Sequence, residues 1–330
     1  MLDQEWLKTF KVVEFGYTEE PQPIHYENYL NWIEGNKHLP LNYLEDHRKE
    51  LRSDVRKYYP EFQSALVFLF SYHQEKRWLD NFYSGIKSNG LKIASYTLGF
   101  KGHDYHHEIR QSLEIILNKL KESYPKVEGV ISLDIHPVLE RDLALRAGLG
   151  FQGKNSMFIS KKNGSFFIIG SLLLNQKLKL EIKKIDTDHC GQCTRCIDSC
   201  PTKAIEPTTR TIISKDCIST FTIEEFKIDS IPSTNMDLGS GYIFGCDICQ
   251  SVCPWNLRLE RKLPFENVNL DSKAEEIIKF FLQPEPSVVK ESIEKQSNNE
   301  FNKIFKGTSF ERSGKRGILK NLIFYLKNKR

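Results

Sequence analysis

The chain has 330 residues, of which 39% are hydrophobic and 27% charged, and its formal net charge is +4. This is an ordinary composition for a soluble protein of two or three structural units, and it argues against a disordered or fibrous chain. No run approaches the roughly 18 apolar residues of a membrane span. The first residues, MLDQEWLKTF, hold acids where a secretory leader has bases and an apolar segment, so we expect a cytoplasmic protein.

Helices and buried strands are predicted to alternate along the first half of the chain. Residues 1–60 are polar with spaced aromatic side chains and are predicted to be helical. The runs SALVFLFS (64–71) and VEGVISL (127–133) are predicted strands, and residues 104–122 between them carry apolar side chains at helical spacing. A further helix is predicted at 137–147. This alternation favours an α/β layer.

The next segment contains a misleading glycine pattern and two short apolar runs. Gly148, Gly150 and Gly153 spell G-x-G-x-x-G, but a helical segment precedes them where a dinucleotide-binding turn needs a strand. We therefore predict no dinucleotide site. The runs SMFIS (156–160) and SFFIIGSLLL (165–174) are expected to form a hairpin through KKNG.

Seven of the eight cysteines fall into two runs with ferredoxin spacing. The first run reads C-x2-C-x2-C-x3-C and the second C-x2-C-x3-C, and a proline follows each. In such runs three close thiolates hold one 4Fe–4S cluster, and the cysteine before the proline ligates the other cluster. With the eighth cysteine, the pattern predicts two ligand sets: Cys190, Cys193, Cys196 and Cys253 for cluster 1, and Cys200, Cys217, Cys246 and Cys249 for cluster 2.

Other uses of these cysteines agree less well with the pattern. A zinc ribbon also contains C-x2-C pairs, but the triplet spacing and the prolines are untypical of it. Disulfide frameworks belong mainly to short secreted chains. Ferredoxin-type clusters relay single electrons, so a second bound cofactor or a substrate is expected near them.

Asp134 is the candidate acid. It follows the second predicted strand and precedes a turn and a helix. A carboxyl group at this place, partly desolvated beside a cofactor, would keep its proton and could donate it to a leaving oxygen. The alternative is an aspartate that caps the helix. His103, His106 and His107 lie at a helix start and His136 follows Asp134; a structural or cofactor-edge role is expected for these histidines.

The last thirty residues are strongly basic. From residue 301 onward nine Lys and Arg residues accompany a single acid, which gives a net charge of +8. Clustered bases neutralise phosphates and give salt-dependent affinity for nucleic acids. The alternative is a helix with a solvated basic face.

Six segments form a wider signature: ELRSDVRKYYPEFQSAL, the Asp104-Tyr105-His106 helix start, LDIHPVLERDLALRAGLGFQGKNSM, DHCGQCTRCIDSCPTKAI, DCISTFTIE and FGCDICQSVCPWN. Together they resemble the epoxyqueuosine reductase family over nearly the whole chain. The resemblance implies reduction of epoxyqueuosine to queuosine at the wobble position of tRNA, the last step of queuosine biosynthesis. It also implies base-off cobalamin. Neither D-x-H pair continues into the motif that supplies an axial histidine, so a corrin is expected to lack a protein histidine ligand.

The resemblance implies an α/β (α+β) fold with three parts. These are a cobalamin-binding catalytic domain (1–180), a ferredoxin-type domain with two 4Fe–4S clusters (181–264) and a helical basic tail that binds tRNA (265–330). Asp134 would donate the proton as the epoxide oxygen leaves. The remaining expected contacts are Arg56, Asp134, Asn155, Phe158, Ile169 and Ser219 with the corrin, and Arg141, Arg312, Lys315 and Arg316 with tRNA.

Some features depart from the family pattern. The chain ends at Arg330, so we expect a short form without C-terminal helical repeats, monomeric and served by an external electron donor. Ile135 and His136 stand where small residues are usual, and Phe151 where tryptophan is usual. Three alternatives remain: a reductive dehalogenase, which typically carries a twin-arginine signal, a plain electron-transfer protein, and a tRNA-binding module with structural clusters.

Overall fold

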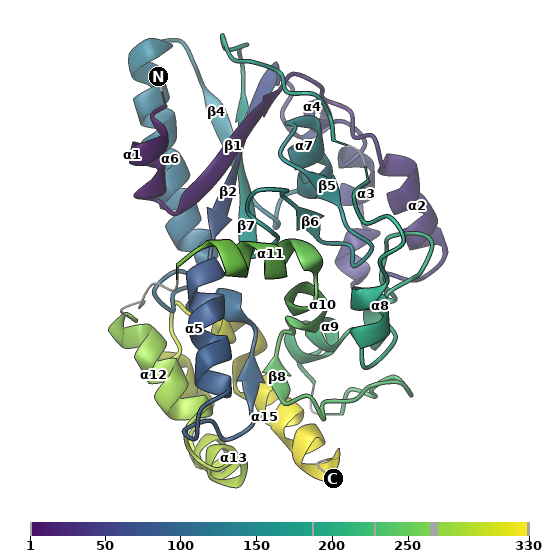
Figure 1. Cartoon of the computed structure of the whole chain (residues 1–330), viewed down its shortest axis with the longest axis vertical. Coiled ribbons are helices and arrows are strands. Elements are labelled where there is room, and N and C mark those ends of the chain that lie inside the picture. Colours follow the sequence, from purple (N-terminus) through teal and green to yellow (C-terminus); the bar gives the residue numbers. More distant parts are fainter. Residues whose placement is uncertain (1, 187, 228, 265–269, 329–330) are drawn as a thin grey trace.

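The structure is a computed structural model that describes residues 2–186, 188–227, 229–264 and 270–328. Figure 1 shows a sheet-containing upper part and a lower body of helices, with the short helices of the cysteine region, α8 (Arg195–Ser199), α9 (Ile218–Ile223) and α10 (Ile248–Ser251), along one side. Within the described ranges, no helix combines the length and apolar character needed to cross a bilayer.

The upper part is built on a four-stranded sheet in the order β1-β2-β7-β4, antiparallel throughout. Its strands are β1 (Val12–Thr18), β2 (Ser64–Ser71), β4 (Gly129–Ser132) and β7 (Phe167–Leu174). Successive side chains of β2 alternate between the faces. Leu66, Phe68 and Phe70 belong to the core under α6 (Tyr105–Ser123), and Val67 and Leu69 to the core under α7 (Glu140–Arg146).

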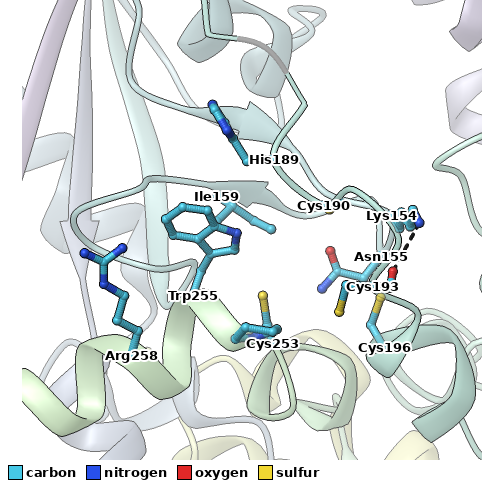
Figure 2. Close-up of a pocket in the computed structure, with 11 residues that line it drawn as sticks. Lys154, Asn155, Ile159, His189, Cys190, Cys193, Cys196, Cys253, Trp255 and Arg258 are labelled. Carbon is cyan, nitrogen blue, oxygen red and sulfur yellow. Dashed lines mark hydrogen bonds between the residues drawn. The ribbon is translucent and has the colours of Figure 1, made fainter.

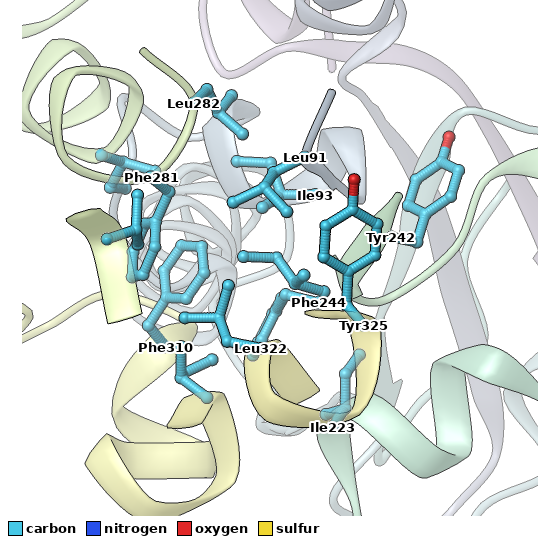
Figure 3. Close-up of a cluster of buried hydrophobic side chains, with 14 of the residues drawn as sticks. Leu91, Ile93, Ile223, Tyr242, Phe244, Phe281, Leu282, Phe310, Leu322 and Tyr325 are labelled. Atoms are coloured by element: carbon cyan, nitrogen blue, oxygen red, sulfur yellow. The ribbon is translucent and has the colours of Figure 1, made fainter. Parts of the chain in front are cut away.

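The lower body has its own apolar core. The strands β3 (Lys92–Ile93) and β8 (Tyr242–Phe244) pair in parallel, and helices pack around them: α5 (His73–Tyr83), α9, α12 (Ser272–Phe281), α13 (Pro286–Lys295) and α15 (Phe310–Asn328). Figure 3 shows Phe281, Phe310 and Leu322 gathered around Phe244. This core joins segments that the predicted boundaries at 180 and 264 separate; the three-domain division remains a prediction.

The remaining elements are short. They are α1 (Gln4–Lys8), α2 (Tyr26–Glu34), α3 (Arg48–Leu51), α4 (Val55–Tyr58), α11 (Pro254–Lys262), α14 (Asn298–Ile304) and the pair β5 (Phe151–Gln152) and β6 (Phe158–Ile159). Gly148 has a positive φ of 69° and lies between α7 and β5, so a helix precedes the glycine pattern as expected.

Most predicted elements are confirmed, and two predictions are wrong. The predicted strand at 64–71 is β2, and the predicted helix at 104–122 is α6. Residues 1–60 are not wholly helical, because β1 pairs with β2 at the sheet edge. The expected hairpin does not form either: β6 pairs with β5, whereas β7 inserts between β2 and β4. Seven of the eight residues of β7 are buried, so this strand suits the sheet centre.

Candidate iron–sulfur and acid–base site

The four thiols predicted for cluster 1 come together from two distant segments. Cys190 and Cys193 lie in the loop before α8, Cys196 lies in α8, and Cys253 directly precedes α11. All four thiols line one cavity of about 350 Å³ (Figure 2). Burial raises the pKa of the Cys196 thiol to about 11, with a further contribution from neighbouring Cys190 and Cys253. The crossed set predicted from spacing is therefore a spatial group.

The second predicted set also forms one group. Cys217 directly precedes α9, Cys246 follows β8, Cys249 lies in α10 and Cys200 ends α8. Burial raises the pKa of Cys246, and the charges of Cys217 and Cys200 add to the effect. Cys249 lies within electrostatic reach of these three thiols and also of Cys196 in the other set. The two thiol groups are therefore neighbours.

The donor chemistry of both groups suits iron–sulfur clusters. All eight cysteines are free thiols. Within the described ranges, no three His, Cys, Asp or Glu side chains gather closely enough for a single metal ion, whereas four thiols of cluster 1 surround a volume. Ligands spread around a volume match a polynuclear cluster. Burial raises the pKa of five of these thiols, so cluster binding must release protons from them: Cys196, Cys217, Cys246, Cys249 and Cys253.

A hydrogen-bonded acid–base group lies at the start of α6. Asp104 is the N-cap residue of α6, and its Oδ1 accepts the backbone N–H of His106 at 2.9 Å. His106 Nδ1 lies 2.6 Å from the same oxygen, and His106 Nε2 lies 2.7 Å from Asp134 Oδ1. The Tyr105 hydroxyl donates to Asp134 Oδ2 at 2.5 Å. The imidazole of His106 is therefore held between two carboxylates.

This geometry decides where the proton resides. Burial raises the pKa of Asp134, but the hydrogen bond and positive charge of His106 outweigh burial and leave that pKa below its usual value. Burial lowers the pKa of His106, but Asp104 and Asp134 raise it to about 9. At neutral pH the proton is on His106. The prediction that desolvation keeps Asp134 protonated beside a cofactor stays a prediction; in the described residues, the hydrogen bond and charge of His106 act in the opposite direction.

Two buried polar atoms have no hydrogen-bond partners in the described residues: Glu140 Oε2, within electrostatic reach of Asp134, and Arg52 Nη1, whose side chain is within electrostatic reach of Glu140. Burial raises the pKa of Glu140 to about 8, and the charge of Asp134 raises it further. Buried polar atoms are normally hydrogen-bonded, so an unpaired acceptor or donor points to a missing partner. A ligand with amide groups at its edge, such as a corrin, has the chemistry to pair with both.

A chain of contacts joins the start of α7 to the second thiol group. Arg141, next to Glu140 in α7, donates to the backbone oxygen of Ser156 and to its Oγ, the latter at 3.1 Å. The neighbouring Asn155 is buried and donates from Nδ2 to the carbonyl of Cys249 at 3.3 Å. The loop at 155–156 thus touches both the start of α7 and a predicted ligand of cluster 2.

The expected corrin contacts fall in several places. Phe158 and Ile169 are buried in the core between the sheet and α7, and Ser219 is half-buried in the first turn of α9. Arg56 is exposed and is paired with Asp54 at 2.7 Å. The structure brings Asn155, Phe158 and Ile169 to one side of the sheet, and it leaves Arg56 engaged with its own neighbour. These contacts remain predictions.

The bases of the C-terminal segment have different environments. Arg312 donates to Glu224 Oε2 at 2.6 Å, and its charge contributes to the low pKa of Asp134. Lys315 donates to the carbonyl of Glu294 at 3.3 Å, and Arg316 is exposed. Arg312 therefore lies near the acid–base group.

Not every base of the segment is available to a ligand. Lys320 is buried, and its Nζ lies 3.7 Å from the centre of the Phe221 ring. Lys329 and Arg330, which contribute to the predicted charge, lie outside the described residues.

The sequence did not predict the acid–base roles of Tyr105, His106 and Glu140. A structural or cofactor-edge role was expected for His106, and Tyr105 and His106 entered only as part of the Asp104-Tyr105-His106 signature. The nearby His136 accepts a hydrogen bond at Nδ1 from the backbone N–H of Leu133 at 3.0 Å.

These features define a class, an α/β oxidoreductase with two ferredoxin-type cluster sites beside an acid–base group. A family model described as "4Fe-4S double cluster binding domain" matches residues 189–256, and one described as "Epoxyqueuosine reductase QueG, DUF1730" matches residues 52–134. The epoxyqueuosine reductase of Cyclobacterium marinum is 35% identical over 313 residues, covering 95% of this chain and 90% of the relative. That of Leadbetterella byssophila is 33% identical, covering 89% and 86%. The chain belongs to the epoxyqueuosine reductase family.

Solved structures share the fold. The structure of epoxyqueuosine reductase from Streptococcus thermophilus superposes with a TM-score of 0.76 at 22% identity, covering 98% of this chain and 80% of that one. A crystal structure of an epoxyqueuosine reductase with a tRNA-Tyr epoxyqueuosine-modified stem loop gives a TM-score of 0.72 at 22% identity with the same coverage.

Proposed function

We propose that this protein reduces epoxyqueuosine to queuosine in the anticodon loop of tRNA. The observation that carries the proposal is the Asp104–His106–Asp134 group, which occurs in the same chain as two neighbouring groups of four thiols. Conversion of an epoxide to an alkene consumes two electrons and two protons and releases water. The site therefore needs an electron path and proton donors in one place, and family membership supplies the substrate class.

The chain's own residues would hold two kinds of cofactor. The two thiol groups would bind two 4Fe–4S clusters, and Glu140 and Arg52 would pair with the amide edge of cobalamin. When bound, the clusters supply single electrons and the corrin supplies a low-potential cobalt centre for reduction of the epoxide carbon. His106 is held by two carboxylates, so it is not free to ligate cobalt, in keeping with base-off binding.

The residues at the start of α6 would move the proton. His106 holds it at Nε2, 2.7 Å from Asp134 Oδ1, and can pass it to that carboxylate. The neutral carboxyl group of Asp134 then donates to the epoxide oxygen as negative charge develops there. Asp104 keeps the imidazole oriented, and the hydroxyl of Tyr105 fixes the second oxygen of Asp134.

Recognition of tRNA would use the cations near this group. A base in an RNA loop must be splayed out to enter a pocket, and the flanking phosphates then need neutralising. Arg312 lies within electrostatic reach of Asp134 and Arg141 within reach of Glu140, and Lys315 and Arg316 follow on α15. That a relative has been solved with a modified tRNA stem loop supports RNA as the substrate class. We further propose a monomeric, cytoplasmic enzyme.

The test is anaerobic reconstitution with iron, sulfide and cobalamin, followed by incubation with epoxyqueuosine-containing tRNA and a reductant. Nucleoside analysis by mass spectrometry should show loss of one oxygen atom from the modified base. Protein with full iron and corrin content that leaves the tRNA unchanged, or reduces only organohalides, would overturn the proposal.

A further inference from the structure

Cluster 1 is the outer of the two cluster sites. Every residue from 188 to 196 is exposed or half-exposed, so its ligand loop lies at the surface. Around cluster 2, by contrast, Asp247 and Gln250, which flank Cys246 and Cys249, are buried. Asn155 donates to the carbonyl of Cys249, a ligand of cluster 2, and also lines the cavity of cluster 1. Electrons from outside therefore have their shortest entry at cluster 1.

The lining of the cluster 1 cavity carries cations and no carboxylate among the described residues. Beyond its thiols, the cavity is lined by Lys154, Asn155, Ile159, His189, Pro254, Trp255 and Arg258. Two exposed acids lie in the neighbouring ligand segment: Asp188 is paired with Arg210 at 2.5 Å, and Asp198 accepts from the hydroxyl of Thr194 at 2.7 Å. Figure 2 shows Trp255 and Arg258 at one side of the cavity and Lys154 at the opposite side.

The charge continues along α11. Arg258, Arg261 and Lys262 are exposed and stand at i, i+3 and i+4, which places them on one face of the helix. Glu260, the single acid of α11, is half-buried and lies within electrostatic reach of Lys76. We call Lys154, Arg258, Arg261 and Lys262 the cationic rim.

We propose that the cationic rim is the docking surface for an acidic protein that delivers single electrons to cluster 1. Each docking event oxidises the carrier by one electron and reduces cluster 1 by one electron, with no bond made or broken. Electron-transfer contacts are small and transient, and opposite charge raises their association rate rather than their lifetime. Trp255 supplies an aromatic surface between the charges.

A second polyanion, RNA, would also be attracted to such a surface. The placement favours an electron carrier. The rim borders the cavity of the outer cluster, whereas the charges that act most on Asp134 are those of His106 and Arg312. Proximity to cluster 1 serves a donor of electrons and gives no advantage to an RNA substrate.

The experiment uses the full chain with reconstituted clusters and no tRNA, so it depends on the clusters and not on the proposed substrate. Reduction by a reduced plant-type [2Fe–2S] ferredoxin, an acidic one-electron carrier, is followed in a stopped-flow instrument as loss of cluster absorbance. The triple variant Arg258→Glu, Arg261→Glu, Lys262→Glu is compared with Lys87→Glu, Lys126→Glu, Lys303→Glu, which changes the charge equally at exposed positions elsewhere.

At low salt the rim variant should be reduced by the ferredoxin about 10- to 100-fold more slowly than wild type, and its rate should lose most of its dependence on salt. The control variant should stay within about threefold of wild type. Reduction by dithionite, a small reductant, should be equal in all three proteins.

Three results would overturn the proposal. One is an unchanged ferredoxin rate in the rim variant, and another is an equal loss with dithionite. The third is a selective loss of tRNA binding with normal ferredoxin kinetics, which would assign the rim to RNA.

Discussion

Replacement of His106 by asparagine tests the proton assignment most directly. Asn keeps a polar side chain at the position but cannot carry a proton between Asp104 and Asp134. In the wild-type protein the two carboxylates raise the pKa of His106 from 6.5 to about 9, although burial opposes them. The shift corresponds to an upper limit of about 3 kcal/mol of interaction with the charged imidazole. Solvent screening at Asp134, whose side chain is 41% exposed, reduces that figure.

The sign of the stability effect follows from the raised pKa. Because the folded-state pKa of His106 lies above its unfolded value, the stabilisation is complete below pH 6.5 and is lost as pH rises toward 9. The unfolding free energy of wild type should fall by about 2 kcal/mol across this window relative to His106→Asn. Urea denaturation at several pH values measures the difference.

The same group should control turnover. In single-turnover assays with reconstituted enzyme, wild-type activity should decline above pH 9, and His106→Asn should lose on the order of 10²- to 10³-fold in rate at pH 7. The exposed neighbour His107 provides the matched control, since His107→Asn should behave as wild type. A variant at His106 that keeps its rate and the same alkaline decline would refute the reasoning.

Four further changes separate the parts of the site. Asp104→Asn retains a good helix cap but removes one negative charge beside the imidazole, so the alkaline limit of activity should move to lower pH while the melting temperature changes little. Asp134→Asn should abolish turnover and leave iron and corrin content intact, as measured by metal analysis and absorbance. Cys253→Ser should remove the cluster held with Cys190, Cys193 and Cys196, detected as loss of about half of the iron. Charge reversal at Lys315 and Arg316 should weaken tRNA binding and flatten its salt dependence in filter-binding assays.

Each of these changes has an outcome that contradicts it. An unshifted pH profile in Asp104→Asn would mean that Asp104 acts only as a cap. Turnover in Asp134→Asn would remove this carboxyl group from the proton path. Loss confined to the other cluster in Cys253→Ser would overturn the crossed ligation, and unchanged tRNA affinity after charge reversal would assign the two bases another role.

Local spacing predicted the thiol groups well, because ferredoxin runs encode both the ligands of one cluster and the crossing to the next. Periodicity likewise predicted β2 and α6. It could not predict that β7 lies between β2 and β4, since an apolar run has the same appearance in a hairpin and at a sheet centre. The role of His106 was hidden for a related reason. It depends on a contact between the start of α6 and a loop 28 residues later, which no local pattern encodes.

The C-terminal helix α15 has a structural role that its charge does not reveal. Asn321 is fully buried, and its Nδ2 donates to the carbonyls of Thr222 and Ile243, each at 2.8 Å. Thr222 belongs to α9, which Cys217 directly precedes, and Ile243 belongs to β8, which leads into Cys246. One side chain of α15 therefore ties together the two elements that present ligands of cluster 2. Lys320 also donates to the carbonyl of Glu225 at 2.6 Å, so the middle of α15 holds the segment that follows α9 in place. Because Asn321 and Lys320 are both engaged in this way, the exposed Arg316 is better placed than either of them to meet RNA.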